Sequence, residues 1–290
     1  MTTAVADVAA QSVGLRIRLA AWRVAQWAVM LVVAGTIIVP VGFAVLGGFR
    51  TTGELQNNPA ALPASWYPAN YLEILGGDAF WTELINSLLI TTITTFVAVG
   101  AAALAAFVFA RVAFRGRETL YTLFVLGLLF PVAVAILPLY IVIRGIGLLD
   151  NPLGVALPQA AFLLPLTIVI LRPFFWSIPI ELEDAARIDG CGTFGFFWRV
   201  LLPLSRPALA TVAVLAVVQS WNAFLLPLLI LSDQSQWTLP LGVMNFSTEY
   251  TSDIARVLAF TSLAIVPALA FYVIAERQLI GGLTSGAVKG

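Results

Sequence analysis

Histidine is absent from this chain of 290 residues, and cysteine occurs once, at Cys191. Without histidine there is no imidazole for acid–base catalysis or metal binding. One cysteine cannot form a disulfide within the chain. Lysine also occurs once, at Lys289, next to the last residue. A Walker A loop needs a lysine just before a helix, so this chain cannot bind ATP in that way. If ATP drives its function, another polypeptide supplies the site.

Charge is equally scarce. Charged residues make up 10% of the chain and hydrophobic residues 60%, whereas soluble domains carry roughly 25% charged residues. The formal net charge is zero, which gives no reason to expect a nucleic-acid partner. With neither histidine nor a buried acid pair, we expect no catalytic residue and no metal site. This composition is typical of an integral membrane protein in contact with the lipid bilayer.

Six apolar segments are long enough to cross a bilayer, since a spanning helix needs about 20 mostly apolar residues. The segments are 24–47, 84–109, 119–143, 152–176, 207–231 and 257–280. Each is free of charge over most of its length, apart from Arg172 near the end of the fourth. Lipid cannot satisfy the open edges of strands. We therefore predict an all-α membrane protein with six transmembrane helices over 24–281.

The placement of lysine and arginine predicts the orientation, since cytoplasmic loops are enriched in both. With the N-terminus in the cytoplasm, twelve basic residues lie inside and three outside. The outer set is Arg50, Arg144 and Arg256, and the inner set is Arg16, Arg18, Arg23, Arg111, Arg115, Arg117, Arg172, Arg187, Arg199, Arg206, Arg277 and Lys289. Both termini are therefore expected in the cytoplasm, as is the segment 183–203. We expect Arg111, Arg115 and Arg117 to act only as positively charged anchors.

The segments that flank the spans have weaker patterns. Residues 1–23 are expected to be cytoplasmic, with an amphipathic stretch from 11 to 24 that fits either a helix on the inner membrane surface or a disordered positive flank. No small-residue cleavage site follows the first apolar run, so we expect no cleaved signal peptide. Residues 282–290 form an expected cytoplasmic tail.

Two expected outer loops, 48–83 and 232–256, are long. The first contains a short helix pattern, Asn70 to Leu75. Loops longer than about 15 residues are uncommon without a function. They fit either a surface that receives a soluble partner or ordinary caps that close the helix bundle.

The polar segment 179–203 has the pattern of two short helices. Pro179 fits the first turn of a helix, and Glu181, Glu183 and Asp184 follow it, where the helix dipole favours carboxylates. Gly190 fits a left-handed cap. Thr193 is expected to cap a second helix, from Phe194 to Leu202, which ends at Pro203. Leu182, Ala185, Ala186 and Asp189 share one face at helical spacing. The pattern fits either a docking elbow for a partner or an amphipathic connector.

The same segment resembles the "EAA" signature of the permeases of binding-protein-dependent ABC importers. Here it is Asp184-Ala185-Ala186, then Gly190, and then Val200-Leu201-Leu202-Pro203. Asp184 replaces the glutamate of the signature and Val200 its isoleucine. The tail 282–290, Asn86-Ser87-Leu88 and Trp221-Asn222 are similar to sugar permeases of the maltose-transporter type. The resemblance covers the chain from about residue 25 to its end.

The resemblance implies the type I importer permease fold, in a bacterial or archaeal cell membrane. It implies a second, related permease subunit, two cytoplasmic ATPase subunits that hold ATP and Mg²⁺, and an extracytoplasmic sugar-binding protein. This chain is then no enzyme and holds no cofactor. The residues expected to couple it to the ATPase are Glu183, Asp184, Ala185, Ala186, Gly190, Phe194, Leu202 and Pro203. The tail residues expected at the ATPase interface are Thr284, Ser285 and Lys289.

Polar residues in the fifth span suggest where substrate passes. Gln219 and Asn222 are three apart, hence on one helix face, and Trp221 lies between them. Amides and an indole suit a sugar, whose hydroxyls need hydrogen bonds and whose ring face stacks. The alternative is interhelical hydrogen bonding, worth about 0.6 kcal/mol per contact. A polyol or glycerol phosphate is the alternative substrate, but no basic residue lies in the middle of a span to bind a phosphate ester, which favours a neutral sugar.

Two other classes of function compete with an ATP-driven importer. A secondary transporter predicts inverted repeats and ionisable residues in the middle of the membrane, and the sequence has neither. A membrane-embedded enzyme lacks candidate catalytic groups. The prediction is therefore a carbohydrate permease subunit that couples to an ATPase on another chain.

Overall fold

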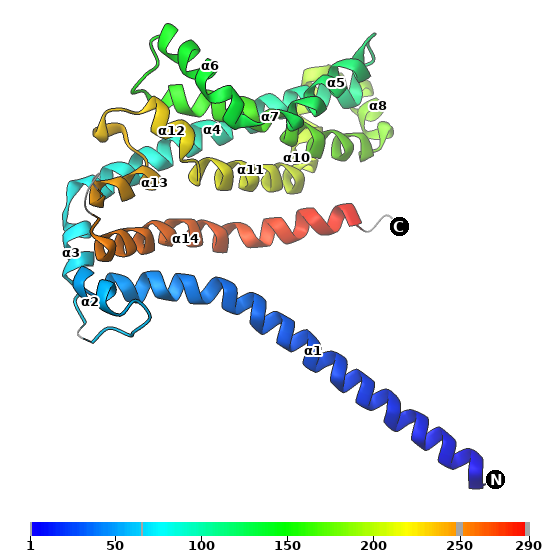
Figure 1. The fold of residues 1–290 in the computed structure, drawn as a ribbon. Coiled ribbons are helices and arrows are strands. Elements are labelled where there is room, and N and C mark those ends of the chain that lie inside the picture. Colours follow the sequence, from blue (N-terminus) through cyan, green and yellow to red (C-terminus); the bar gives the residue numbers. More distant parts are fainter. Residues whose placement is uncertain (1, 65, 248–251, 288–290) are drawn as a thin grey trace.

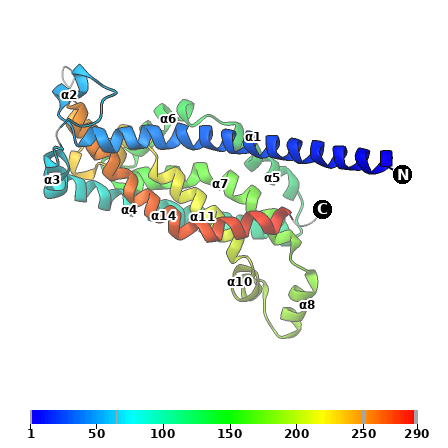
Figure 2. The ribbon, with the colours of Figure 1, turned by 90° about the horizontal axis from the view of Figure 1, so that it is seen from below.

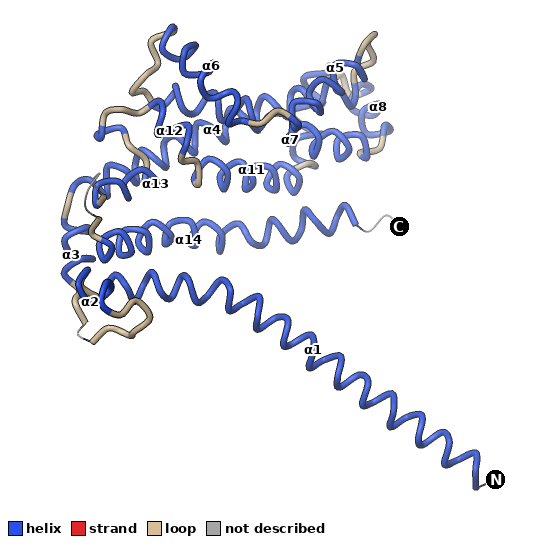
Figure 3. The backbone as a smooth tube through the Cα atoms, viewed as in Figure 1, coloured by secondary structure: helices blue, strands red, loops and turns tan. Residues whose placement is uncertain are grey.

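The computed structural model describes residues 2–64, 66–247 and 252–287, with side chains described between 21 and 273 of these ranges, and the described chain is built from helices joined by short loops (Figure 3). The long helices are α1 (Thr2–Gly48), α4 (Asp78–Arg111), α7 (Pro152–Ser177), α11 (Arg206–Trp221) and α14 (Ile254–Ala287). Helix α4 packs along α7, and α11 contacts α4, α7 and α14. These four helices form one bundle (Figure 1).

Short elements gather at the two ends of this bundle (Figure 1). The end that we call the cap end holds α2 (Thr52–Asn57), α3 (Ala69–Gly76), α12 (Leu225–Ile230), η3 (Gln234–Gln236), α13 (Leu239–Gly242) and η4 (Val243–Phe246). The opposite end, the elbow end, holds α8 (Ile180–Ile188), α9 (Thr193–Phe196), η2 (Phe197–Leu201) and α10 (Leu202–Leu204). Figure 2 shows the segment from α8 to α10 projecting away from the bundle.

Four of the six predicted spans are continuous apolar helices. They are Ala21–Gly48, Asp78–Arg111, Pro152–Ser177 and Ile254–Val273. The short helix predicted over 70–75 is confirmed as α3.

The predicted third span, 119–143, is bent rather than continuous, as its prolines at 131 and 138 suggest. The chain here forms α5 (Arg117–Leu126), η1 (Gly127–Leu129) and α6 (Val132–Gly145), and the two halves are bent by 102°. The break lies at Phe130 and Pro131, which both have extended backbone angles. A residue before proline is sterically pushed out of the helical region. A single span at this place is therefore a bent one.

The predicted fifth span, 207–231, is not a single helix either. Helix α11 ends at Trp221, and three residues separate it from α12, which begins at Leu225. Pro227 explains the break, because within a continuous helix its ring would clash with the carbonyl of Ala223. The preceding segment, Thr193–Leu204, meets α11 at an angle of 78°. The fifth apolar run is thus shorter as a helix than its composition suggests.

Helix α1 lies mostly apart from the bundle (Figure 1). Only 6% of its most apolar window is buried, and its buried residues lie at its C-terminal end. There a Cβ on Gly48 would come within 2.4 Å of the Tyr71 hydroxyl and 2.8 Å of the Ala259 Cα. A glycine is therefore needed for α1 to approach α14 so closely. The helix continues back to Thr2, so no helix break marks the expected boundary at residue 24.

The loop that follows α1 is held by buried hydrogen bonds. The guanidinium of Arg50 donates to the carbonyls of Asn58 and Pro59 over 2.7 and 3.1 Å. The Asn70 amide donates to the carbonyls of Gly48 and Arg50, both over 2.9 Å. Buried amide and guanidinium donors that satisfy several carbonyls at once fix the path of an irregular segment. The cap end is therefore an ordered part of the fold.

The most extensive helix contact in the described structure lies between α4 and α7. Ala98, Ala102 and Ala106 recur every four residues along α4 and are fully buried. Small residues at this spacing let two helix backbones approach closely in a membrane. Further towards the elbow end, Phe175 of α7 and Phe197 of η2 join the same buried cluster as Ala102 and Ala106. The elbow is thus packed onto the bundle by an apolar core.

Candidate functional site

The first half of the elbow ends in a Schellman turn, as the glycine pattern predicted. Gly190 has a φ of +81°. The Cys191 N–H donates to the Ala186 carbonyl over 2.8 Å, and the Gly190 N–H donates to the Arg187 carbonyl over 3.0 Å. This pair of bonds satisfies carbonyls that a helix end otherwise leaves free. The turn reverses the chain and presents the α8 tip as a compact unit.

The second half of the elbow starts one residue earlier than predicted. Gly192 is the N-cap, Thr193 is the first helical residue, and no side chain caps this helix. The expectation that Thr193 caps the helix is therefore wrong. The Gly192 carbonyl accepts the first helical bond, from the Phe196 N–H over 2.9 Å. The helix then passes through a π-helical turn, η2, before Pro203 and the end of α10.

The elbow has an apolar side buried against the bundle and an exposed side. Its buried side chains are Glu183, Ala186, Phe196, Phe197 and Leu201. Its exposed residues include Leu182, Asp184, Ala185, Ile188, Asp189, Gly190, Phe194, Trp198 and Pro203, while Leu202 is partly buried. The face predicted to hold Leu182, Ala185, Ala186 and Asp189 is thus divided, since only Ala186 is buried. Two large apolar side chains, Ile188 and Phe194, are 87% and 70% exposed.

Glu183 and Asp184 are neighbours in sequence but point to opposite sides. Asp184 is exposed, whereas the Glu183 side chain is 8% exposed and accepts a hydrogen bond from Arg187 over 2.7 Å. Its second oxygen lies 3.8 Å from Nη1 of Arg111, whose side chain is 7% exposed. Burial at this level makes Arg111 part of the interior. The expectation that it acts only as a surface anchor is wrong.

The guanidinium of Arg111 also binds the end of α7. Its Nε and Nη2 donate to the Phe175 carbonyl over 3.1 and 2.7 Å, and Nη2 also donates to the Ile178 carbonyl. Arg172 of α7 makes the reciprocal contact, donating from Nε to the Phe109 carbonyl of α4 over 3.2 Å. Each arginine thus satisfies a carbonyl near the C-terminus of the neighbouring helix.

Arg172 is enclosed by a second set of partners. Its guanidinium carbon lies 3.9 Å from the centre of the Tyr121 ring, and Nη2 donates to Glu118 over 2.5 Å. These groups belong to α5, so α4, α5 and α7 are joined at the elbow end. A cation over an aromatic face is stabilised by the ring quadrupole.

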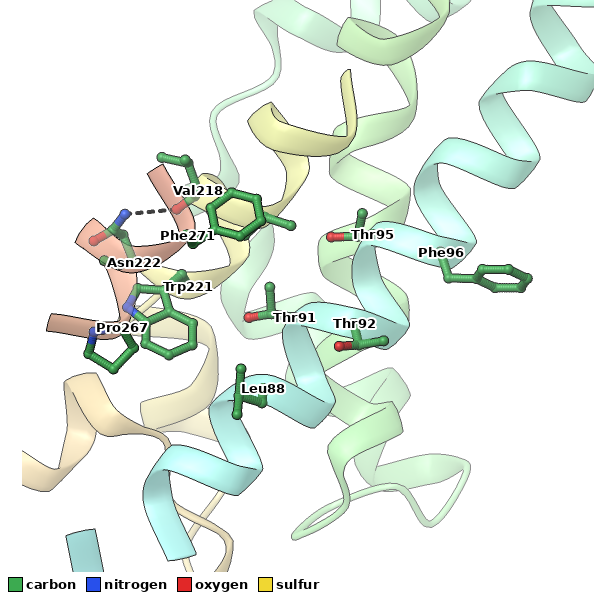
Figure 4. A pocket seen from close by; sticks show the side chains of 12 residues that line it. Leu88, Thr91, Thr92, Thr95, Phe96, Val218, Trp221, Asn222, Pro267 and Phe271 are labelled. Atoms are coloured by element: carbon green, nitrogen blue, oxygen red, sulfur yellow. Dashed lines mark hydrogen bonds between the residues drawn. The ribbon is translucent and has the colours of Figure 1, made fainter. Parts of the chain in front are cut away.

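A cavity of about 390 Å³ lies between α4, the end of α11 and α14. Thr91, Thr92 and Thr95 line it from α4, and Trp221 and Asn222 from the end of α11 (Figure 4). The rest of its lining is Leu88, Phe96, Val217, Val218, Pro267, Ala268 and Phe271. Asn222 donates to the Val218 carbonyl over 2.8 Å (Figure 4). The Thr95 hydroxyl is buried and has no partner within the described structure.

A second cavity, of about 510 Å³, lies on the other side of α11. Gln219 and Asn222 both line it, as expected for residues three apart on a helix. Trp221 lines only the first cavity and Asn222 lines both. The three residues proposed from the sequence therefore border two cavities.

Sequence reasoning missed Gln159, which lines the second cavity from α7. Its Oε1 accepts hydrogen bonds from Ser220 over 2.6 Å and Thr94 over 3.1 Å. Its Nε2 is buried and has no partner within the part of the chain that is described. A lone glutamine between the prolines at 158 and 165 gives no pattern that marks it. Its position beside Ser220 is visible only in the fold.

The expected tail residues fall outside the part of the chain whose side chains are described. Thr284 and Ser285 belong to the helical backbone of α14, and Lys289 lies outside the described residues altogether. Their role at an interface stays a prediction.

Comparison with known proteins agrees with this geometry. Residues 98–278 match the family of inner membrane components of binding-protein-dependent transport systems. A trehalose transport system permease protein of Mycobacterium tuberculosis is 35% identical over 92% of this chain and 98% of its own length. A diacetylchitobiose uptake system permease protein of Streptomyces coelicolor is 33% identical over 87% of this chain and 84% of its own. An arabinooligosaccharides transport system permease protein of Halalkalibacterium halodurans is 32% identical over 89% and 93%.

A solved structure shares the fold. A chain of a bacterial ABC transporter involved in the import of alginate superposes with a TM-score of 0.78 and 21% identity, over 88% of this chain and 95% of that one. The elbow with its glycine turn lies within the matched family region. The relatives span almost the whole chain. This chain therefore belongs to the family of inner membrane components of binding-protein-dependent transport systems.

Proposed function

We propose that this chain is the permease subunit of an ATP-driven importer for a neutral carbohydrate. The observation that carries the substrate class is the lining of the two cavities beside α11. It combines hydroxyls and amides with an indole, and neither lining includes a charged side chain. Sugar hydroxyls need such hydrogen bonds, and an aromatic face packs against a sugar ring. The similar permeases of trehalose, diacetylchitobiose and arabinooligosaccharide systems support the same class.

The unpartnered polar atoms suggest where the sugar would bind. The Thr95 hydroxyl borders the first cavity and the Gln159 amide nitrogen the second. A buried polar group without a partner costs about 1–3 kcal/mol. A passing hydroxyl that pairs with either group removes that cost. Asn222 borders both cavities, so it is the residue best placed to contact substrate on either side.

The exposed side of the elbow is the proposed site of ATPase docking. Asp184, Ala185, Gly190 and Phe194 would contact a groove on a cytoplasmic ATPase. The elbow end, with both chain termini, would then be cytoplasmic, in keeping with the excess of basic residues predicted there. The ordered cap end would face outwards and receive the sugar-binding protein. A second related permease would complete the path.

The mechanism couples two equilibria. ATP closes the partner ATPase dimer, which moves the elbow, and the packed helices turn from inward-open to outward-open. Sugar then enters from the binding protein, and hydrolysis resets the inward-open state. No bond is made or broken by this chain. Its contribution is to transmit movement between the ATPase and the cavities.

Reconstitution tests the proposal. The chain is placed in proteoliposomes with its ATPase, partner permease and binding protein, and ATP-dependent uptake is measured for trehalose, diacetylchitobiose, an arabinooligosaccharide and glycerol 3-phosphate. We expect uptake of at least one neutral sugar. Asn222→Ala should lower the apparent affinity roughly fivefold, the effect of losing about 1 kcal/mol of hydrogen bonding.

Matched variants make the result interpretable. Val134→Ala, at an exposed apolar position of α6, should leave uptake unchanged. Deletion of Asp184 to Gly190 should release the ATPase from the complex. Uptake that persists in vesicles without any ATPase would disprove an ATP-driven importer. Uptake of glycerol 3-phosphate alone would disprove the neutral-sugar assignment.

A further inference from the structure

The elbow end brings together the C-termini of two parallel helices. Helix α4 ends at Arg111 and α7 at Ser177, and the contacts of Arg111 with the Phe175 carbonyl show that the two ends coincide. Each helix C-terminus carries roughly half a negative charge. Parallel alignment therefore places two negative ends side by side. A guanidinium between them offsets their repulsion.

Arg111 is the group in this position that also reaches the elbow. Its Nε and Nη2 are directed to the α7 carbonyls and its Nη1 to Glu183 of α8. One planar guanidinium, carried by α4, thus contacts both the end of α7 and Glu183 of α8. Its fork geometry fixes these partners relative to one another, which a single ammonium cannot do.

Helix α8, unlike the second half of the elbow, would be poorly fixed by the covalent link alone. Only Ile178 and Pro179 separate the end of α7 from the start of α8. On α8 itself, just Glu183 and Ala186 are buried. Ala186 is small, so its burial gives little apolar contact. The Glu183–Arg111 pair is therefore the main side-chain attachment of α8 to the bundle.

We propose that Arg111 is a positioning residue for coupling: through Glu183 it fixes α8 to the C-terminal ends of α4 and α7. This inference rests on the proposed function and adds the route by which movement enters the bundle. Force on the exposed side of the elbow passes through Glu183 and Arg111 into α4 and α7. Those helices carry Thr95 and Gln159, which border the two cavities. Asp184 contacts the ATPase, while its neighbour Glu183 holds α8 to the bundle.

A double-mutant cycle on the reconstituted complex tests this route. The variants are Arg111→Gln, Glu183→Gln and the double variant, with Arg111→Lys as a conservative replacement. Arg115→Gln, an exposed arginine four residues away, is the matched control. The measurement is ATP hydrolysis stimulated by the binding protein, with the sugar from the uptake panel that stimulates the wild-type complex. The amount of ATPase that copurifies is measured alongside it.

Arg111→Gln should lower the stimulation about tenfold while the ATPase still copurifies, within the roughly 5- to 150-fold range of couplings between two sites. Glu183→Gln should act in the same direction. The double variant should be no worse than Arg111→Gln, because both residues act through one contact. Arg111→Lys should recover part of the stimulation, and Arg115→Gln should match the wild type.

Three results would overturn the inference. They are normal stimulation of Arg111→Gln, effects of the two single variants that multiply in the double variant, and an equal loss in Arg115→Gln. If Arg111→Gln does not assemble, Glu183→Gln and Arg111→Lys decide the question, and normal stimulation in both counts against it. A wild-type complex that no sugar of the panel stimulates, or that binds no ATPase, instead counts against the proposed function.

Discussion

Replacing Gly190 isolates the contribution of the elbow turn. A Cβ at this position would have nothing within 4 Å, so an added methyl group meets no steric clash. The cost of the substitution lies in the backbone conformation, because the φ of Gly190 is +81°, in the left-handed region. For a residue with a Cβ the left-handed region costs about 1–2 kcal/mol. Gly190→Ala should therefore destabilise the turn by that amount and leave the surrounding packing unchanged.

The expected effect on ATPase binding follows from the fraction of permease molecules in which the turn is folded. If the folded turn is the form that docks, its loss weakens the apparent affinity in proportion to the fraction that remains competent. One to two kcal/mol corresponds to roughly a 5- to 30-fold change. Gly190→Asn should have a smaller effect, because asparagine tolerates this region better than alanine.

Gly192 provides a matched control two residues away. It also has nothing within 4 Å of a Cβ, but its φ is −71°, which any residue adopts. The assay is binding of the purified ATPase to the permease in nanodiscs, with hydrogen exchange of the Cys191 amide as an independent report on the turn. Equal weakening by Gly190→Ala and Gly192→Ala would refute the reasoning, as would an unchanged Cys191 amide in Gly190→Ala.

Three further predictions concern stability, measured as thermal unfolding in detergent. Phe197→Ala should destabilise the protein by about 3–5 kcal/mol, since Phe197 is 1% exposed. Trp198→Ala should have a much smaller effect, because Trp198 is 62% exposed. Equal effects of the two variants would contradict the packing described for the elbow. Gly48→Ala should weaken the attachment of α1, because its Cβ would meet the Ala259 backbone at 2.8 Å. Gly35→Ala, whose Cβ would have nothing within 4 Å, should be neutral or favour the helix by about 1 kcal/mol. A stabilising effect of Gly48→Ala would disprove the close approach of α1 to α14. Asn70→Leu should cost about 1–3 kcal/mol by leaving two buried carbonyls without donors, and an unchanged unfolding temperature would contradict it.

The sequence was sufficient where one local rule determined the structure. Apolar length identified four continuous helices, and a glycine after an acidic-to-basic helix pattern identified the turn at Gly190. Hydropathy averages over a window, so apolar length alone gave neither the 102° bend at Pro131 nor the break before Pro227. Pro131 was expected to interrupt the third span, whereas Pro227 was given too little weight against the apolar pattern of the fifth.

The buried polar contacts could not be predicted in the same way. Arg111 and Phe175 are 64 residues apart, and the Gln159–Ser220 contact spans 61 residues. No spacing rule joins such positions, since they meet only after α4, α7 and α11 have packed. Glu183 and Asp184 also looked equivalent in sequence. Their opposite directions follow from how α8 is rotated against the bundle.

The attachment of α1 at one end makes it a lever. Its apolar part, 28 residues from Ala21 to Gly48, is about 42 Å long at 1.5 Å per residue. The pivot lies at Gly48, where α1 touches Tyr71 and α14. For an arm of this length, a rotation of about 5° at the pivot moves the far end by roughly 4 Å. Small changes at the cap end are therefore amplified into large displacements at the opposite end of α1.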